Sequence, residues 1–164
     1  MKELKFKTIF ILVIFSALFS FAYNNFSKNS IPLTIERPEI VFENEAGKKI
    51  SSDKIKAVKF TKAENLFNLG VVFIDARDKW DFSDGHIKGS VNIPEYDSDS
   101  YEEDIKKLDK SDSYIIYCGG DDCDTSVRLY QKLAKMGFKD IYVYLGGWNE
   151  WKNSNMPIEK GISK

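Results

Sequence analysis

Three short apolar runs constrain the fold of this chain more than any other feature of its sequence. They are Val71–Ile74, Tyr114–Tyr117 and Ile141–Leu145, and none of them alternates with polar residues. A strand with one wet face alternates apolar and polar side chains, so an unbroken run of this length indicates a strand buried on both faces. Such strands are typical of parallel sheets that helices cover on both sides.

Helical patterns alternate with these runs. Apolar residues recur at helical spacing from Ser126 to Met136, and Gly137 follows as a stop signal. A further helix is expected over Thr61–Leu69, with its first residue as the N-cap and Glu64 as the capping-box partner. The alternation of strands and helices predicts the α/β class, with a parallel sheet flanked by helices.

The first 22 residues differ in character from the rest. A short lysine-containing start precedes the apolar run Ile9–Tyr23, which only Ser16 and Ser20 interrupt. This pattern matches a signal peptide that is cleaved after Ala22. Residues 8–26 are also long enough to span a bilayer as an uncleaved anchor. In both cases the basic start predicts an exported domain, which is periplasmic or anchored to the outer face of the inner membrane.

The remainder divides into a linker and one domain. Residues 23–55 are polar with weak periodicity, and we expect a linker in which the β-like piece Ile40–Phe42 adds an edge strand. Residues 56–160 carry the alternating pattern and form the predicted domain. The acidic stretch Glu95–Asp104 lacks the central glycine of a calcium-binding loop, so we expect a solvated loop there.

Composition excludes several kinds of protein. Two cysteines and one histidine among 164 residues are too few for a four-ligand structural zinc site or a disulfide framework. A net charge of −1 offers no basic surface for nucleic acid. We therefore expect no metal, no cofactor and no nucleic-acid partner, whereas composition does not predict the oligomeric state.

Unusual residues follow two of the expected strands. Asp75-Ala76-Arg77 follows the first, and Cys118 opens a glycine-containing loop that leads from the second strand into a helix at Ser126. Parallel strands end at one edge of the sheet, where ligands usually bind. Loop glycines and a helix N-terminus stabilise a thiolate without a metal. We interpret Cys118 as the catalytic nucleophile; the alternative is a small buried hydrophobic residue.

Several of these motifs resemble those of the rhodanese family of sulfurtransferases. Asp75-x-Arg77 with the run Gly85–Pro94 resembles its first signature, and Cys118 leading into Ser126-Val127-Arg128 resembles its active-site loop and helix. The resemblance implies a rhodanese-like three-layer sandwich with a five-stranded parallel sheet flanked by helices. It also implies a cysteine that accepts a sulfane sulfur as a persulfide and passes it to a thiol acceptor, which includes protein thiols.

The candidate loop departs from the usual form of that family, because seven residues separate Cys118 from Ser126 in a longer Cys-Gly-Gly-x-x-Cys loop. Acidic residues stand where the family has arginines, and they oppose an anionic donor such as thiosulfate and raise the pKa of the thiol. Cys123 either acts as a resolving thiol or fills the loop. The whole candidate loop comprises Gly119, Gly120, Asp121, Asp122, Cys123, Asp124, Thr125 and Ser126.

Three residues are expected to support the site. Asp75 is expected to anchor backbone, and His86 to be structural. Arg77 is expected to form an ion pair with a nearby carboxylate; the alternative is a contact with the substrate. The hypotheses are an exported sulfurtransferase with a Cys118 persulfide, a thiol-redox protein with a Cys118–Cys123 disulfide, and a non-catalytic binding module of the same fold. Phosphatase or arsenate-reductase chemistry is disfavoured, because it needs a loop arginine to clamp an oxyanion.

Overall fold

The computed structural model describes residues 2–27, 30–31, 39–42, 54–120 and 124–161. The chain divides into two compact units, residues 1–37 and residues 38–164. Asp121, Asp122 and Cys123 of the candidate loop lie outside the described residues.

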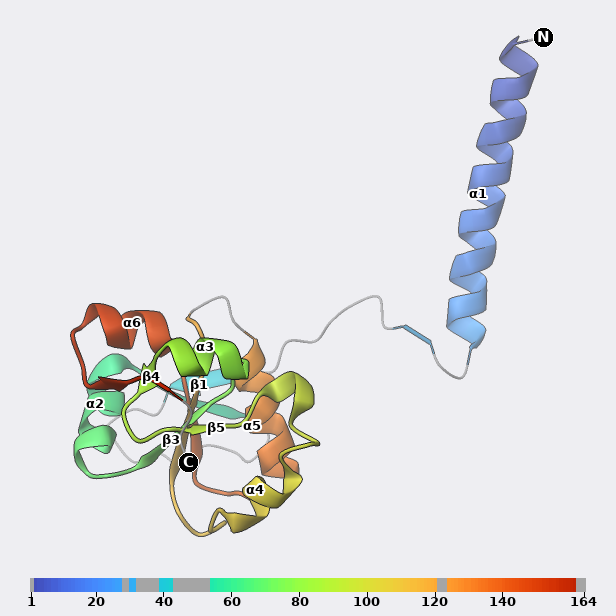
Figure 1. Cartoon of the computed structure of the whole chain (residues 1–164). Coiled ribbons are helices and arrows are strands. Elements are labelled where there is room, and N and C mark those ends of the chain that lie inside the picture. Colours follow the sequence, from blue (N-terminus) through green and yellow to red (C-terminus); the bar gives the residue numbers. More distant parts are fainter. Residues whose placement is uncertain (1, 28–29, 32–38, 43–53, 121–123, 162–164) are drawn as a thin grey trace. The chain divides into compact units, whose positions relative to one another are not determined.

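The first unit contains one long apolar helix, α1 (Lys2–Phe26) (Figure 1). Its segment Phe6–Phe26 has 21 residues and a mean hydropathy of 2.0, and none of it is buried. A helix of that length spans roughly 30 Å, the thickness of a bilayer core. Its length and composition therefore suit a membrane span, and a signal sequence near an N-terminus has the same properties.

A single parallel sheet organises the second unit. Its strands, in spatial order, are β1 (Ile40–Phe42), β2 (Ile55–Val58), β7 (Ile141–Tyr144), β6 (Tyr114–Tyr117), β3 (Val72–Asp75) and β5 (Val91–Asn92). Every neighbouring pair is parallel. The three unbroken apolar runs form β3, β6 and β7, which lie inside the sheet where both faces are covered. The α/β class and the parallel sheet are thus confirmed.

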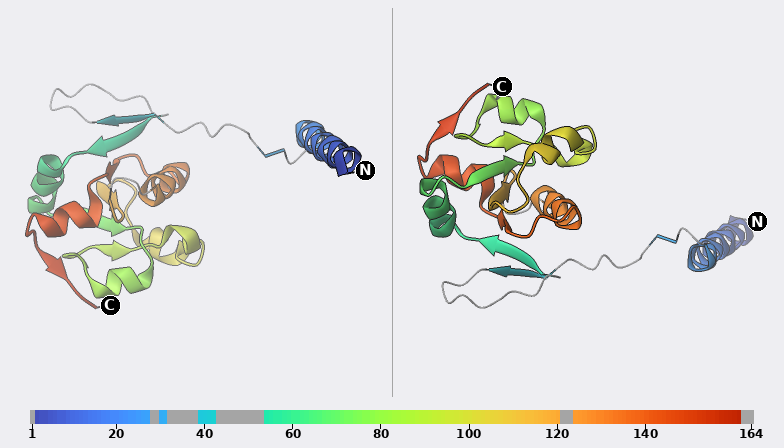
Figure 2. Two further views of the ribbon diagram at one scale, coloured as in Figure 1. Left: turned by 90° about the horizontal axis from the view of Figure 1, so that it is seen from above. Right: turned by 90° about the horizontal axis from the view of Figure 1, so that it is seen from below.

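The remaining elements are α2 (Phe60–Asn68), α3 (Lys79–Asp84), β4 (His86–Ile87), η1 (Glu95–Asp97), α4 (Glu102–Lys107), α5 (Thr125–Lys135), α6 (Gly147–Asn153) and β8 (Ile158–Glu159). Strands β4 and β8 form a separate antiparallel pair. Both views in Figure 2 place α2 and α6 on one side of the sheet and α4 and α5 on the other.

Two hydrophobic clusters fill the space between these layers. Successive residues of β6 point to opposite faces, so Ile116 packs with residues of α4 and α5, whereas Ile115 packs with residues of α2 and α6. Trp151 is fully buried in the second cluster, where Phe73 and Phe67 lie against it with ring centroids 5.4 Å and 5.1 Å away. Side chains of this size each contribute about 1.5–3 kcal/mol or more through burial. The three-layer arrangement follows from this packing.

The sheet has six strands: the five that the family resemblance implies, and the expected edge strand β1, which pairs with β2. One detail of the fold differs from the sequence-based expectation. Helix α2 begins at Phe60, and its N-cap, Lys59, makes no side-chain capping hydrogen bond. Thr61 therefore lies inside the helix, and the expected capping box with Glu64 is wrong. The N-cap lies two residues before the expected one, and Phe60, the first helical residue, packs edge-on against Trp151 with ring centroids 6.3 Å apart.

Candidate active site

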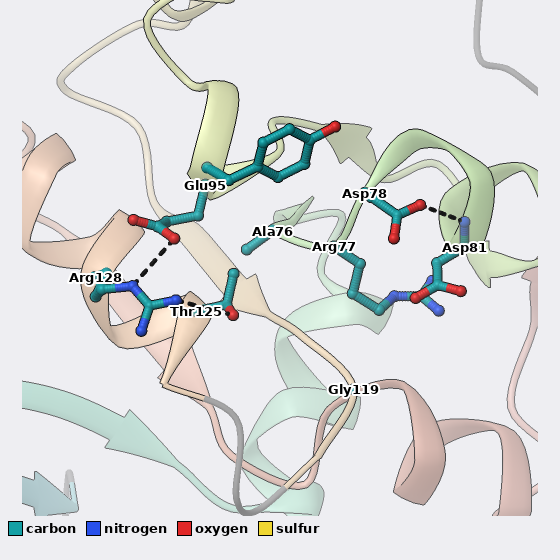
Figure 3. Close-up of a pocket in the computed structure, with 9 residues that line it drawn as sticks. Ala76, Arg77, Asp78, Asp81, Glu95, Gly119, Thr125 and Arg128 are labelled. Atoms are coloured by element: carbon teal, nitrogen blue, oxygen red, sulfur yellow. Dashed lines mark hydrogen bonds and ion pairs between the residues drawn. The ribbon is translucent and has the colours of Figure 1, made fainter.

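A cleft lies at the edge of the sheet where β3 and β6 end. It has a volume of about 380 Å³, which lies within the range of roughly 300–1,000 Å³ that is typical of small-molecule sites. Figure 3 shows residues from the ends of the two strands and from α3, η1 and α5 around this cleft. The cleft is lined by Ala76, Arg77, Asp78, Asp81, Glu95, Tyr96, Gly119, Thr125 and Arg128.

Cys118 follows directly after β6, next to the cleft-lining Gly119. It is 2% exposed, and its Sγ lies 3.4 Å from the Oγ of Ser126 in the first turn of α5. That helix has 11 residues, so its N-terminus contributes partial positive charge beside the sulfur. The structure contains Cys118 in its disulfide-bonded form. A helix N-terminus at this position stabilises negative charge on the sulfur once the cysteine is reduced.

The start of α6 fixes the backbone of the loop. The amide of Trp148 donates to the carbonyl oxygen of Cys118 at 2.8 Å, and the amide of Asn149 donates to that of Gly119 at 3.0 Å. In a trans peptide the N–H points opposite to the carbonyl. The amide of Gly119 therefore points away from α6, and Gly119 itself lines the cleft.

Gly147 makes this close approach possible. Its φ of +55° lies in the left-handed region, where a side chain is strained. A Cβ at this position would overlap the carbonyl oxygen of Cys118 and would lie 3.0 Å from the amide nitrogen of Gly120. The absence of a side chain at residue 147 thus lets α6 reach the loop.

A buried ion pair stiffens the segment after β3. Asp75 is fully buried and accepts hydrogen bonds from the backbone amide of Arg77 at 2.9 Å and from its Nη2 at 2.7 Å. The same Nη2 donates to the carbonyl oxygen of Gly85 at 2.7 Å. Burial alone would lower the pKa of the guanidinium, but the hydrogen bonds and the charge of Asp75 raise it above its usual value. The pair therefore joins β3 to the C-terminal end of α3.

Aromatic rings cover this ion pair. The guanidinium of Arg77 lies 4.9 Å from the ring centre of Trp148, within the range of a cation–π contact. A Cβ on Gly85 would lie 2.9 Å from the same indole ring. Arg77 thereby connects the segment Asp75–Arg77, at the end of β3, to the start of α6, which fixes the Cys118 loop.

Tyr117, at the end of β6, ties the same region together from the face of the sheet that α2 and α6 cover. Its hydroxyl accepts a hydrogen bond from the amide of Ile87 at 3.1 Å and lies 3.1 Å from the Oγ of Ser90. Burial raises the pKa of this phenol well above its usual value, and the charge of Asp75 adds to the effect. The phenol therefore stays neutral and serves as a hydrogen-bonding centre of the core.

His86 lies away from the cleft. Its Nδ1 is 2.8 Å from the carbonyl oxygen of Phe82, and its ring stacks on the Phe82 ring with centroids 3.7 Å apart. The side chain is nearly completely buried and does not line the cleft. This environment gives His86 an architectural position.

The structure brings together residues that the sequence analysis did not select. The Nε of Arg128 pairs with the Oε2 of Glu95 at 3.0 Å, and Asp81 and Tyr96 also line the cleft. Arg128 follows Thr125 by three positions, so both lie on one face of α5. That spacing was the sequence signal that could have identified Arg128. The sequence offers no such signal for Glu95, because its pairing with Arg128 depends on where η1 lies in the fold.

The described residues of the candidate loop do not all line the same hollow. Thr125 and Gly119 line the cleft, whereas Gly120 lines a second, polar hollow beside α6. Asp124 is the exposed N-cap residue of α5, and it makes no side-chain capping hydrogen bond. Within the described ranges, no group of three His, Cys, Asp or Glu side chains is arranged to hold a metal ion.

Comparison with known proteins identifies the class to which this fold and site belong. The family model described as "Rhodanese-like domain" matches residues 60–154. The chain belongs to the rhodanese-like family, whose named relatives include sulfurtransferases.

Two curated relatives are both named thiosulfate sulfurtransferase GlpE. The protein of Stutzerimonas stutzeri is 30% identical over 93 residues, which cover 57% of this chain and 81% of the relative. The protein of Pseudomonas savastanoi is 29% identical over 99 residues, which cover 60% and 89%. Among solved structures, the rhodanese-like domain of the Alr3790 protein from Anabaena sp. is 27% identical with a TM-score of 0.54, covering 65% of this chain and 80% of that one.

Proposed function

We propose that this protein is an exported rhodanese-like sulfurtransferase that carries sulfane sulfur as a persulfide on Cys118. The observation that supports this most directly is the position of Cys118, between the end of β6 and the N-terminus of α5 and next to the cleft. The relatives named as thiosulfate sulfurtransferases support the same class of reaction.

The reaction proceeds in two displacements at sulfur. The Cys118 thiolate attacks the outer sulfur of a sulfane donor; the donor's S–S bond breaks, and its electron pair leaves with the donor fragment, which is sulfite if the donor is thiosulfate. An acceptor thiolate then attacks the outer sulfur of the Cys118 persulfide. The second S–S bond breaks, its electron pair returns to Cys118, and no net oxidation occurs. The N-terminus of α5 and the outward amide of Gly119 stabilise the anionic sulfur.

The charge of the cleft bears on the choice of donor. Three carboxylates, from Asp78, Asp81 and Glu95, line it against two arginines, and this balance disfavours a small dianion. A neutral or singly charged sulfane, such as a protonated polysulfide, meets less repulsion than thiosulfate. Helix α1 supports export, either as a signal sequence or as an anchor.

Intact-mass spectrometry tests the proposal. The protein is reduced, freed of reductant, and treated with polysulfide or with thiosulfate. One added sulfur atom on the wild type and on Cys123→Ser, and none on Cys118→Ser, is the expected result. An adduct that persists in Cys118→Ser would refute the assignment. The mass of the protein recovered from its native host reports on cleavage after Ala22.

A second candidate function is thiol redox chemistry, which the disulfide-bonded form of Cys118 favours. The chain contains one other cysteine, Cys123, so an intramolecular disulfide of Cys118 has one available partner. Mild oxidation with diamide followed by alkylation tests this function. An intramolecular disulfide that thiols reverse would support it, and two alkylated cysteines after oxidation would contradict it.

A further inference from the structure

The hydroxyl of Ser126 is buried directly against the sulfur of the candidate nucleophile. Ser126 lies in the first turn of α5 and is 1% exposed, and its Oγ is 3.4 Å from the Sγ of Cys118. The preceding residue, Thr125, lines the cleft instead (Figure 3). Among the described residues, Cys118 is the one hydrogen-bonding partner of the Ser126 side chain. Buried polar groups are normally hydrogen-bonded, so the sulfur is the partner that satisfies this hydroxyl.

The chemical state of Cys118 gives the direction of this hydrogen bond. The structure contains Cys118 in its disulfide-bonded form, and a disulfide sulfur carries no hydrogen. The Ser126 hydroxyl is therefore the donor and the sulfur is the acceptor. The Sγ of a Cys118 persulfide is likewise bonded to one carbon and one sulfur. The disulfide-bonded form thus stands in for the inner sulfur of the persulfide, the atom that keeps the electron pair when the outer sulfur departs.

We propose that Ser126 is a catalytic residue, whose hydroxyl donates a hydrogen bond to the Cys118 sulfur and promotes release of the carried sulfur. This inference rests on the proposed persulfide chemistry and adds a residue to it. An acceptor thiolate attacks the outer sulfur, the S–S bond breaks, and its electron pair goes to the Sγ of Cys118. The proton of Ser126 stays on its oxygen.

The hydrogen bond becomes stronger as this release step proceeds. It begins on a neutral persulfide sulfur and ends on a thiolate, and hydrogen bonds to ionised groups are roughly twice as strong as neutral ones. Water does not compete for the hydroxyl, because Ser126 and Cys118 are 1% and 2% exposed. An interaction that strengthens toward the transition state lowers the barrier, so Ser126 should speed release.

The same hydrogen bond has a different effect on the loading step. It stabilises the Cys118 thiolate before that thiolate attacks the donor, so a larger fraction is ionised near neutral pH. A more stable thiolate is also a weaker nucleophile and a better leaving group. Where Cys118 is fully ionised, loss of the hydroxyl should therefore speed loading and slow release. A variant that merely loosens the loop should slow both steps.

The experiment compares Ser126→Ala with its parent in a full-length Cys123→Ser background, in which Cys118 is the one thiol. The rate of alkylation by iodoacetamide is measured against pH. Its midpoint should lie roughly one pH unit higher in Ser126→Ala, the size of a hydrogen bond to a charged group. Mass spectrometry follows loading from polysulfide above both midpoints, and release to 2-mercaptoethanol at equal pH and thiolate concentration. Ser126→Ala should load about threefold faster and release at least about threefold more slowly.

Ser98→Ala is the matched control. Ser98 is also 1% exposed, and its Oγ donates to the carbonyl oxygen of Glu95 at 2.8 Å, so this variant loses a buried hydrogen bond away from the sulfur. Its alkylation midpoint and both rates should equal those of the parent. The charged side chains of the cleft and of the described loop, which are the same in all these proteins, are Arg77, Asp78, Asp81, Glu95, Asp124 and Arg128.

The outcomes separate this inference from the function beneath it. If Cys118 takes up no transferable sulfur, the proposed function and the release role both fail. If sulfur is transferred but Ser126→Ala keeps the parent's alkylation midpoint, or slows loading and release together, the role of Ser126 alone is wrong.

Discussion

Replacement of Gly147 by alanine tests how α6 holds the Cys118 loop. The added Cβ would overlap the carbonyl oxygen of Cys118 and would be strained at a φ of +55°. An L-residue in the left-handed region costs about 1–2 kcal/mol. Displacing the carbonyl also weakens its 2.8 Å hydrogen bond with the amide of Trp148, which is worth about 0.5–1.5 kcal/mol. We expect a total loss of roughly 2–3 kcal/mol in the free energy of unfolding.

Gly70→Ala is the matched control. Gly70 has a φ of +83°, but a Cβ there would have no heavy atom within 4 Å. It therefore incurs the backbone strain alone, about 1–2 kcal/mol. Urea denaturation measures both losses, and mass spectrometry measures the rate of persulfide formation. Gly147→Ala should slow that rate at least about tenfold, equivalent to about 1.4 kcal/mol in the barrier, whereas Gly70→Ala should leave it unchanged. Equal persulfide rates in the two variants would refute the role assigned to α6.

Three further predictions concern the groups that support the site. Asp75→Asn leaves the guanidinium of Arg77 without its buried counter-ion, and we expect a loss of about 3–5 kcal/mol in urea denaturation; a loss below about 1 kcal/mol would contradict a buried pair. Tyr117→Phe removes the hydroxyl that accepts from the amide of Ile87, and should cost about 1–3 kcal/mol while persulfide formation on the folded fraction stays near the wild-type rate. Burial alone would raise the pKa of Asp140, but hydrogen bonds from Ser113 and Tyr142 outweigh it and lower the pKa. The stabilisation from Asp140 is thus present above its unfolded pKa and is lost as the pH falls through the lower folded pKa. Asp140→Asn should therefore lose less stability than the wild type on acidification from pH ~5 to ~3, as followed by urea denaturation at each pH.

The inside of the sheet could be predicted from sequence because burial on both faces leaves a local signature. The runs at Val71–Ile74, Tyr114–Tyr117 and Ile141–Leu145 match the strands β3, β6 and β7 with end points within one residue. The edge strand could also be predicted, because the three residues Ile40–Phe42 are all β-like, and pairing with β2 completes it. The start of α2 was missed, because the sequence does not show that Phe60 packs against Trp151, a tertiary contact.

The candidate site, like the fold, could be predicted from the sequence only in part. The neighbourhood of Cys118 could be inferred, since strand, loop and helix are contiguous in sequence. The cleft walls could not, because Glu95 and Arg128 are far apart in the chain and meet only when η1 lies beside the start of α5. The acidic residues of the loop dominate the local sequence, so the contribution of Arg128 to the cleft, beside that of Arg77, was missed. The expectation that residues 95–104 form only a solvated loop is wrong for Glu95, whose side chain is 21% exposed and ion-paired.

A single-turnover transfer experiment tests the central claim most directly. The protein is reduced, loaded with one sulfur atom from polysulfide, desalted, and mixed with excess cysteine. If Cys118 is the sulfur carrier, intact mass will show the loss of that sulfur from Cys118 while an equal amount of cysteine persulfide appears, and Cys118→Ser will show neither. A loaded sulfur that stays on the protein, or one that Cys118→Ser also transfers, would contradict the account.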